Sequence, residues 1–68
     1  MKIIVNGEAR EVPDGATVQD ALIALGMDPE EKGIAVAVDG EVVFRKDWRE
    51  VRVKPGSRVE VVKAVAGG

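Results

Sequence analysis

The residues of this chain that could carry chemistry are the last two, Gly67 and Gly68, which follow an apolar run at positions 59–66. Two residues without side chains form a thin stalk, because glycine lacks Cβ and adopts backbone conformations closed to other residues. Such a stalk can enter a narrow enzyme channel and present the carboxylate of Gly68. A partner that transfers AMP from ATP to this carboxylate would form an acyl-adenylate. A sulfur nucleophile could then displace AMP and leave a thiocarboxylate.

The rest of the sequence offers little catalytic chemistry of its own. It contains no His and no Cys, so the commonest general base, the commonest metal ligand and any thiol nucleophile are missing. Ser57, the one serine, follows Pro55-Gly56, where a hydroxyl typically serves the turn. No phosphate-binding glycine motif and no metal-ligand spacing is present. We therefore expect no catalytic residue, no bound metal and no bound cofactor, with ATP used only by a partner enzyme.

Length and composition indicate one small domain. We expect residues 1–66 to form this domain and residues 67–68 to form a flexible tail, because 68 residues leave no room for a second core. Apolar residues make up 46% of the chain and are mostly aliphatic, which favours strands; Phe44 and Trp48 are the only aromatic residues. The sequence shows no secretion signal and no apolar run of ~20 residues. We expect a cytoplasmic protein that does not bind membranes.

Charge is distributed unevenly along the chain. The formal net charge is −2, with three basic and nine acidic residues at positions 1–43 and seven basic and three acidic residues at positions 44–68. This asymmetry bears on association rather than on fold. Two interpretations stay open. The charges could mix on the folded surface, or a basic face that includes Arg45, Arg49 and Arg52 could steer the chain towards an acidic partner.

The first part of the chain predicts a β-hairpin followed by a helix. Asn6-Gly7 is a strong signal for a two-residue turn between strands, because both positions tolerate positive φ. Thr17 is a good helix N-cap, and Asp20 stands where it completes a capping box. Apolar residues then recur at helical spacing until Gly26, which suits the end of a helix. Such a short helix is stable only if its apolar stripe is buried on a sheet.

The remaining pattern predicts a mixed sheet. Strands are expected at 34–38, 41–44 and 58–65, with a turn at 45–49 and a short edge piece at 51–53. The strand at 34–38 is nearly all apolar, which predicts cover on much of both faces. The order of elements fits an α+β fold in which the first and last strands are neighbours. This is the β-grasp, or ubiquitin-like, arrangement of four or five mixed strands with one main helix on one face.

Five segments together resemble the ThiS family of sulfur carriers in thiamin biosynthesis, and the resemblance covers essentially the whole chain in order. They are Ile3-Ile4-Val5-Asn6-Gly7, Gly15-Ala16-Thr17-Val18, the stretch 35–43, Arg45-Lys46-Asp47-Trp48 and Val65-Ala66-Gly67-Gly68. The Arg-x-x-Trp segment, combined with the Gly-Gly ending, is the most specific part. Phe44 is a departure, because the family often has proline before this arginine. We expect that difference to alter only the local turn and surface.

The resemblance implies a carrier protein rather than an enzyme. It implies that a ThiF-like enzyme adenylates Gly68 with ATP, and that a cysteine desulfurase or another sulfur donor supplies the sulfur. Thiazole synthase, ThiG, would then receive the sulfur from the thiocarboxylate to form the thiazole. Gly67 and Gly68 carry over from the family as the reactive end, and Val65 and Ala66 carry over as the part of the tail that lies in partner channels.

Strand periodicity adds a candidate docking patch. Val62 and Ala64 of the last strand should point away from the helix, with Ile4 of the first strand beside them and Phe44 extending the patch. Exposed apolar patches commonly mark interfaces, although scattered surface hydrophobes are the alternative. Trp48 is expected to pack as core over the edge of the sheet.

Other functions fit parts of the pattern. A molybdopterin-synthase small subunit, or a sulfur carrier for tungsten cofactor or tRNA thiolation, shares the fold and the Gly-Gly ending but lacks the Arg-x-x-Trp segment. A ubiquitin-like protein modifier uses the same activation chemistry, so the sequence does not separate it. A TGS-like module that binds RNA or a regulatory partner shares the Gly-x-Thr-Val lead into its helix. Negative net charge and two aromatic residues argue against nucleic acid as a partner.

Overall fold

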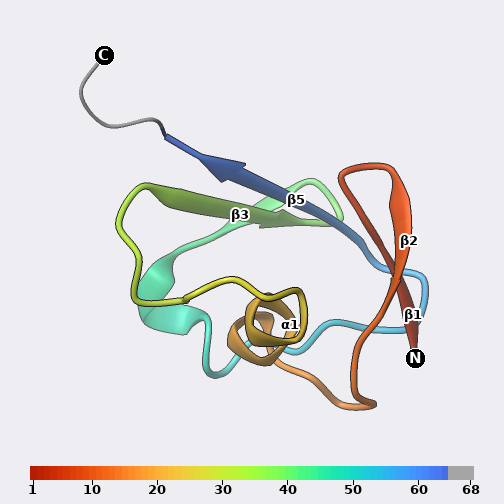
Figure 1. Ribbon diagram of the computed structural model, residues 1–68. Helices are drawn as coiled ribbons and strands as arrows, with labels where there is room; N and C mark the ends of the chain where they lie inside the picture. Colours follow the sequence, from red (N-terminus) through yellow and green to blue (C-terminus); the bar gives the residue numbers. More distant parts are fainter. Residues whose placement is uncertain (65–68) are drawn as a thin grey trace.

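The chain folds as a mixed sheet with one α-helix packed on one face, as the computed structural model shows (Figure 1). It describes residues 1–64; Val65, Ala66, Gly67 and Gly68 lie outside the described residues. The elements are β1 (Lys2–Val5), β2 (Glu8–Glu11), α1 (Val18–Ala24), β3 (Ile34–Val38), β4 (Glu41–Val43), the 3₁₀ helix η1 (Arg45–Asp47) and β5 (Arg58–Lys63). The predicted β-grasp fold is confirmed.

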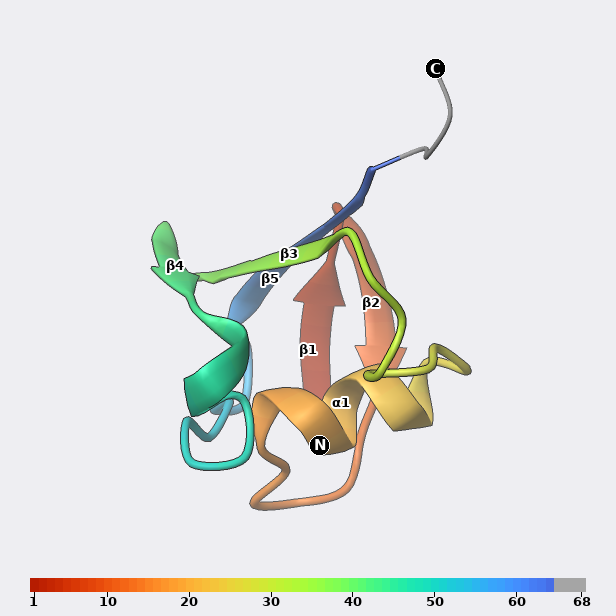
Figure 2. The same ribbon diagram turned by 90° about the vertical axis from the view of Figure 1, so that its left-hand side faces the viewer.

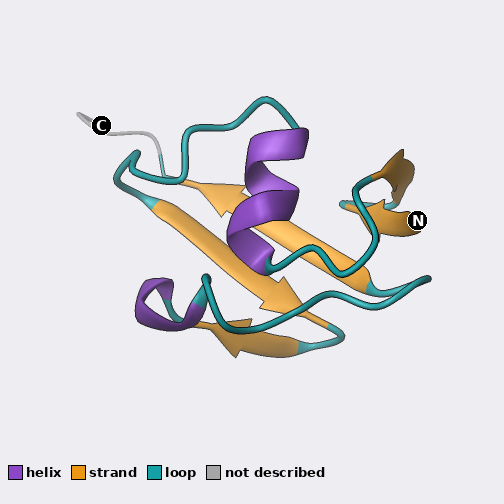
Figure 3. Cartoon of the chain, turned by 90° about the horizontal axis from the view of Figure 1, so that it is seen from below, coloured by secondary structure: helices purple, strands orange, loops and turns teal. Residues whose placement is uncertain are grey.

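The last strand lies in the middle of the sheet. The strand order is β2-β1-β5-β3-β4, with β1 and β5 parallel and the other pairs antiparallel. Helix α1 lies across one face of these strands, as the two rotated views show (Figures 2 and 3). The sheet therefore has a face covered by the helix and an open face. β5 is hydrogen-bonded to a neighbour on both sides, so the segment that leads to the chain end begins from the best-supported strand.

Two tight turns join the hairpins, as the sequence predicts. Asn6 and Asp39 both have φ of +49°, and the glycine after each has φ of +85°. Positive φ at both central residues is the type I′ turn, one of the two turn types whose twist matches the flanking strands in a two-residue loop. Asn and Asp tolerate this conformation better than other residues with side chains, which explains why Asn6 and Asp39 stand directly after β1 and β3.

The cap of α1 is also as predicted. The Thr17 hydroxyl accepts a hydrogen bond from Asp20 N at 3.1 Å, and the Asp20 carboxylate accepts one from Thr17 N at 3.1 Å. This capping box satisfies two backbone donors that the helix itself leaves free. The helix has seven residues and is held by burial of Val18, Ala21 and Leu22 against the sheet.

The core is aliphatic and lies between α1 and the sheet, with one large aromatic ring closing it at the side. Trp48 is only 2% exposed, which confirms its expected place in the core. Its indole nitrogen donates a hydrogen bond to Val43 O at 2.9 Å, so the polar end of the ring is satisfied. The other buried apolar residues are Ile3, Val12, Ala16, Val18, Ala21, Leu22, Ile34, Val36, Val53 and Val59.

Two expectations about the second half of the chain are wrong. β3 is not covered on both faces, because Ala35 is exposed while Ile34 and Val36 are buried. Small alanine side chains leave the open face of this strand to solvent although the strand is apolar throughout. The segment 51–53 adds no strand to the sheet. It pairs instead with the lead into α1, where Val18 N donates to Val51 O and Val53 N donates to Ala16 O, each at 2.9 Å.

Within residues 1–64, the structure contains no helix that is long and apolar enough to span a membrane.

Candidate functional site

The base of the C-terminal tail is held against β3 by main-chain contacts. Lys63 pairs with Ile34 in the antiparallel ladder, and Ala64 N donates a hydrogen bond to Gly33 O at 2.8 Å. Gly33 has φ of +85°, and a Cβ built at this position would lie 3.2 Å from Ala64 O. Glycine is therefore required here both for the backbone conformation and for the close approach of the last described residue.

An ion pair reinforces this contact. Lys63 Nζ lies 2.7 Å from Glu31 Oε1, with both side chains about half exposed. The pair joins β5 to the loop at 26–33, which connects α1 to β3. Water screens an exposed pair of this kind, so its energy is small. The pair marks where the loop and the end of β5 lie side by side.

The Arg-x-x-Trp segment holds the same loop from its other side. The Arg45 guanidinium donates hydrogen bonds to Pro29 O and to Glu31 O, the second at 2.6 Å. The same group stacks over the Trp48 ring, with 4.4 Å between Arg45 Cζ and the ring centroid. We call these three interactions the arginine clamp. They use a planar fork of donors that also stacks flat on an aromatic ring, a geometry that the point charge of lysine does not reproduce.

The arginine clamp involves one of the three basic residues that could steer the chain towards a partner. Arg45 donates to two carbonyls of its own chain but remains exposed and charged, so its steering role stays a prediction. Arg49 and Arg52 are exposed and keep that interpretation; Arg49 Nε makes a side-chain contact of 3.3 Å with Gln19 Oε1. The sequence signalled the importance of Arg45 through its spacing to Trp48, but it did not reveal which residues Arg45 contacts.

An apolar patch lies on the open face of the sheet. Val42, Phe44 and Val62 are 64%, 65% and 62% exposed. The ladder pairs Val62 with Ala35 and pairs Val42 with Ala37, so these residues stand in adjacent cross-strand rows. Phe44 follows Val42 by two residues in extended backbone and continues on the same face. We call Ala35, Ala37, Val42, Phe44 and Val62 the open-face patch.

The patch differs in part from the one expected. Ile4 pairs with Arg58, four residues before Val62 on the same strand, and Glu60 stands between these two positions on the open face. The charged Arg58 and Glu60 therefore separate Ile4 from Val62, so the expectation that they are neighbours is wrong. Ala64 is exposed at the far end of β5. Sequence reasoning missed Ala35, Ala37 and Val42, because β3 was expected to be covered on both faces.

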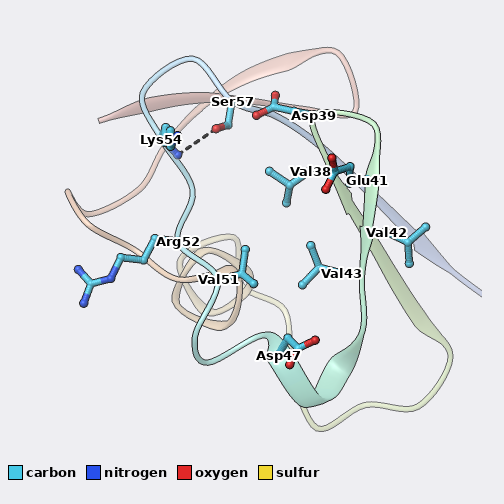
Figure 4. A pocket seen from close by; sticks show the side chains of 10 residues that line it. All are labelled: Val38, Asp39, Glu41, Val42, Val43, Asp47, Val51, Arg52, Lys54 and Ser57. Carbon is cyan, nitrogen blue, oxygen red and sulfur yellow. Dashed lines mark hydrogen bonds between the residues drawn. The ribbon is translucent and has the colours of Figure 1, made fainter.

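A groove of about 370 Å³ lies between β4 and the segment 51–57, and Val38, Val43 and Val51 point into it (Figure 4). Val42 also lines the groove, at its rim on β4 (Figure 4). The Ser57 hydroxyl accepts a hydrogen bond from Lys54 N at 2.9 Å, which is the turn role expected for it. Among residues 1–64, no group of three or more His, Cys, Asp or Glu could hold a metal ion.

The fold and the central β5 define this chain as a β-grasp, or ubiquitin-like, domain. Residues 3–68 match the family model described as the ThiS family. The chain is 31% identical over 68 residues to the sulfur carrier protein ThiS of Escherichia coli and covers the full length of both proteins. A crystal structure of the thiamine biosynthesis protein ThiS from Geobacter metallireducens superposes with a TM-score of 0.81 at 30% identity, with both chains fully covered. The chain belongs to the ThiS family of sulfur carrier proteins.

The family domain also occurs inside longer proteins. The chain is 34% identical to part of a thiazole synthase of Paramagnetospirillum magneticum, with all 68 residues of this chain matched. It spans only 20% of the length of that protein. A domain of this family is therefore covalently joined to a thiazole synthase in that relative.

Proposed function

We propose that this chain carries sulfur as a thiocarboxylate on Gly68 for thiazole formation in thiamin biosynthesis. The observation that carries the proposal is the position of β5, the central strand of a ThiS-family domain, which leads directly into residues 65–68. A carboxylate at the end of such a strand is covalently linked to a rigid body that partners can bind. The chain acts as a co-substrate of its partners rather than as an enzyme.

Sulfur is loaded onto Gly68 in two steps, adenylation and displacement of AMP. A carboxylate oxygen of Gly68 attacks the α-phosphorus of ATP, which forms a mixed anhydride with AMP and releases pyrophosphate. Thiols reduce the persulfide of the sulfur donor and set hydrosulfide free, with a disulfide as the other product. Hydrosulfide then attacks the acyl carbon, the C–O bond to AMP breaks, AMP leaves, and the thiocarboxylate remains. ATP and its metal ion bind to the activating enzyme and not to this chain. The first step is needed because a free carboxylate is a poor electrophile.

We assign the partners by class. A ThiF-like adenylating enzyme carries out the first step, a cysteine desulfurase or another donor supplies sulfur, and a thiazole synthase accepts it. The thiazole synthase is supported by the P. magneticum relative, in which both parts belong to one chain. All of these reactions would take place in the cytoplasm, where ATP and the small-molecule substrates are available.

The open-face patch is the proposed docking surface for these partners. Three large apolar side chains of this patch are more than 60% exposed, which is costly unless a partner covers them. Val62 of the patch lies on the strand that leads to the tail, so a partner that binds there would have the tail close to its surface. Val65, Ala66, Gly67 and Gly68 would enter the active site of that partner.

The experiment is intact-mass spectrometry of the chain after incubation with ATP, cysteine, a thiol reductant, a cysteine desulfurase and the adenylating enzyme of the same organism. The expected result is replacement of one oxygen by sulfur, localised to Gly68. The control is the chain that lacks Gly68, which should stay unmodified and should melt at the same temperature. Sulfur on the shortened chain, or an unmodified complete chain beside a thiolated E. coli ThiS control, would contradict the proposal.

A further inference from the structure

The loop at 26–33 touches both the arginine clamp and the base of the tail. On one side, Arg45 binds the carbonyls of Pro29 and Glu31. On the other side, the Glu31 carboxylate pairs with Lys63, and Gly33 O accepts from Ala64 N. The main chain between these contacts is only a few residues long. A displacement of the loop at Pro29 would therefore also move Lys63 and Ala64, the last described residues before the tail.

The arginine clamp is anchored in the core through Trp48. Trp48 is 2% exposed and its indole N–H is bound to Val43 O, so the platform under Arg45 is fixed in the core. The Arg45 guanidinium donates from two nitrogens to two carbonyls, which sets its orientation as well as its position. Side chains within the loop make a local contact, the hydrogen bond from Glu30 N to Asp28 Oδ1 at 2.9 Å, and Met27 at its start packs against the core. Arg45 thus links the buried core to the middle of the loop, at Pro29 and Glu31.

We propose that Arg45 is a positioning residue for the carrier tail, acting through the loop at 26–33 to set the direction in which the chain leaves Ala64. The inference rests on the proposed function, because direction matters only if the end of the tail must reach an active site. Under this proposal, the Arg-x-x-Trp segment contributes to the reaction without having to contact a partner.

The geometry makes the reaction sensitive to this direction. Four residues separate Ala64 from Gly68, and four extended residues span at most about 14 Å, at ~3.5 Å per residue. If a partner holds this stretch extended, a rotation of about 10° at Ala64 would move its far end by roughly 2 Å. Misplacement of a reacting group by about 1 Å can cost on the order of 100-fold in rate. Docking through the open-face patch does not involve Arg45, so binding and positioning should separate in the kinetics.

The kinetic experiment measures pyrophosphate release by the adenylating enzyme as a function of carrier concentration. Arg45→Ala should lower kcat about tenfold and leave KM within about twofold, because the docked complex forms normally but its carboxylate is misplaced. Arg45→Lys keeps the charge and loses the fork, so it should give an intermediate kcat. Arg10→Ala is the matched control, since Arg10 lies on β2 and its guanidinium is near Glu8 rather than the loop, and its kcat should equal that of the unmodified chain.

A second measurement reports the clamp directly. Amide hydrogen exchange by NMR should show faster exchange at Ala64 N–H in Arg45→Ala, because this amide donates to Gly33 O. The amides of β1 and β2 should keep their rates, whereas a general loss of stability would accelerate all of them together. Glu31→Gln removes the ion pair to Lys63 but leaves both carbonyl contacts of Arg45. It should change kcat and exchange in the same direction by a smaller factor.

The outcomes separate the two proposals. An unmodified chain that is not adenylated at all overturns the proposed function. If that chain is adenylated, and Arg45→Ala keeps both its kcat and its Ala64 exchange rate, the positioning role is overturned and the carrier function stands. A change in KM alone would also overturn it, because that result would place Arg45 in the docking surface.

Discussion

The side chain of Asn6 forms both hydrogen bonds of a strand partner with the main chain of Val61. Asn6 Oδ1 accepts from Val61 N at 2.9 Å, and Asn6 Nδ2 donates to Val61 O at 3.0 Å. The parallel ladder of β1 and β5 ends with the pair Val5 and Val59. The side-chain amide of Asn6 therefore continues the ladder by one more pair, beyond the end of β1. On the other side of β5, Asp39 Oδ1 accepts from Arg58 N at 2.8 Å. The turn residue of each hairpin thus supports the central strand.

Replacing Asn6 by glycine tests this contact. Glycine tolerates the φ of +49° at this position, so Asn6→Gly removes the two side-chain hydrogen bonds without adding strain. We expect the free energy of unfolding to fall by about 1–3 kcal/mol, at ~0.5–1.5 kcal/mol for each of the two bonds. Urea unfolding followed by circular dichroism measures the change. Equal midpoints for the two proteins would show that the bonds to Val61 contribute nothing.

The open-face patch is tested by a charge placed at its centre. Val62→Glu should raise the dissociation constant for the adenylating enzyme or the thiazole synthase at least about tenfold, because a charge buried in an apolar interface costs well over 1.4 kcal/mol. Ile23→Glu is the matched control, since Ile23 is 54% exposed on α1, on the opposite side of the sheet. Calorimetric titration measures both. Equal affinities for the two variants would remove the patch from the docking surface.

Trp48→Phe tests the platform beneath the arginine clamp. The substitution removes ring volume from a site that is 2% exposed and leaves Val43 O without its indole donor. We expect a loss of about 2–4 kcal/mol in the free energy of unfolding, from the cavity and the unpaired carbonyl together. Phe44→Leu should stay within about 0.5 kcal/mol, because Phe44 is exposed. Urea unfolding followed by far-UV circular dichroism measures the free energy of unfolding of both variants. Similar losses for the two would contradict the different burial of these aromatic residues.

The N-terminal ammonium should make stability depend on pH. The hydrogen bond to Asp14, at 2.9 Å, is the main reason that the pKa of the Met1 ammonium is raised above its usual 8.0, and the charge of Glu11 adds to it. A raised pKa in the folded chain means that the folded state holds the proton more tightly. The resulting stabilisation is complete below pH 8 and is lost as pH rises through the folded pKa.

Urea midpoints measured from about pH 7 to about pH 10 test this linkage, on a chain whose Met1 amine is free. The unmodified chain should lose stability over the alkaline part of this range. Asp14→Asn should show a shallower decline, because it lacks the carboxylate that raises the pKa. Parallel curves for the two proteins would mean that the Asp14 contact does not contribute.

Local chemistry made several elements of this fold predictable. Asn6-Gly7 identified the first hairpin because few residue pairs adopt positive φ twice in succession. Thr17 and Asp20 identified the start of α1, because their side chains bind backbone groups only three residues away. The alternation along β5 placed Val59 towards the helix and Val62 towards solvent, as found. Each of these signals depends on neighbours within one turn or one strand.

The candidate site was less predictable because its contacts join distant parts of the chain. Arg45 binds carbonyls 14 and 16 residues before it, and its charge alone suggested a role on the surface. Ile4 was placed beside Val62 because alternation fixes the face of a strand but not the register between strands. The register seen here, with Ile4 opposite Arg58, follows from packing of the whole sheet.

The sequence by itself determined the turns, the helix cap, the alternation of faces and the Gly67-Gly68 ending, because bond geometry and near-neighbour hydrogen bonds act over a few residues. Only the tertiary structure decided which faces meet, that β3 leaves Ala35 exposed, and that Asn6 binds a strand 55 residues further along the chain. Those contacts form only when burial of the aliphatic core offsets the conformational entropy lost by ordering distant segments together.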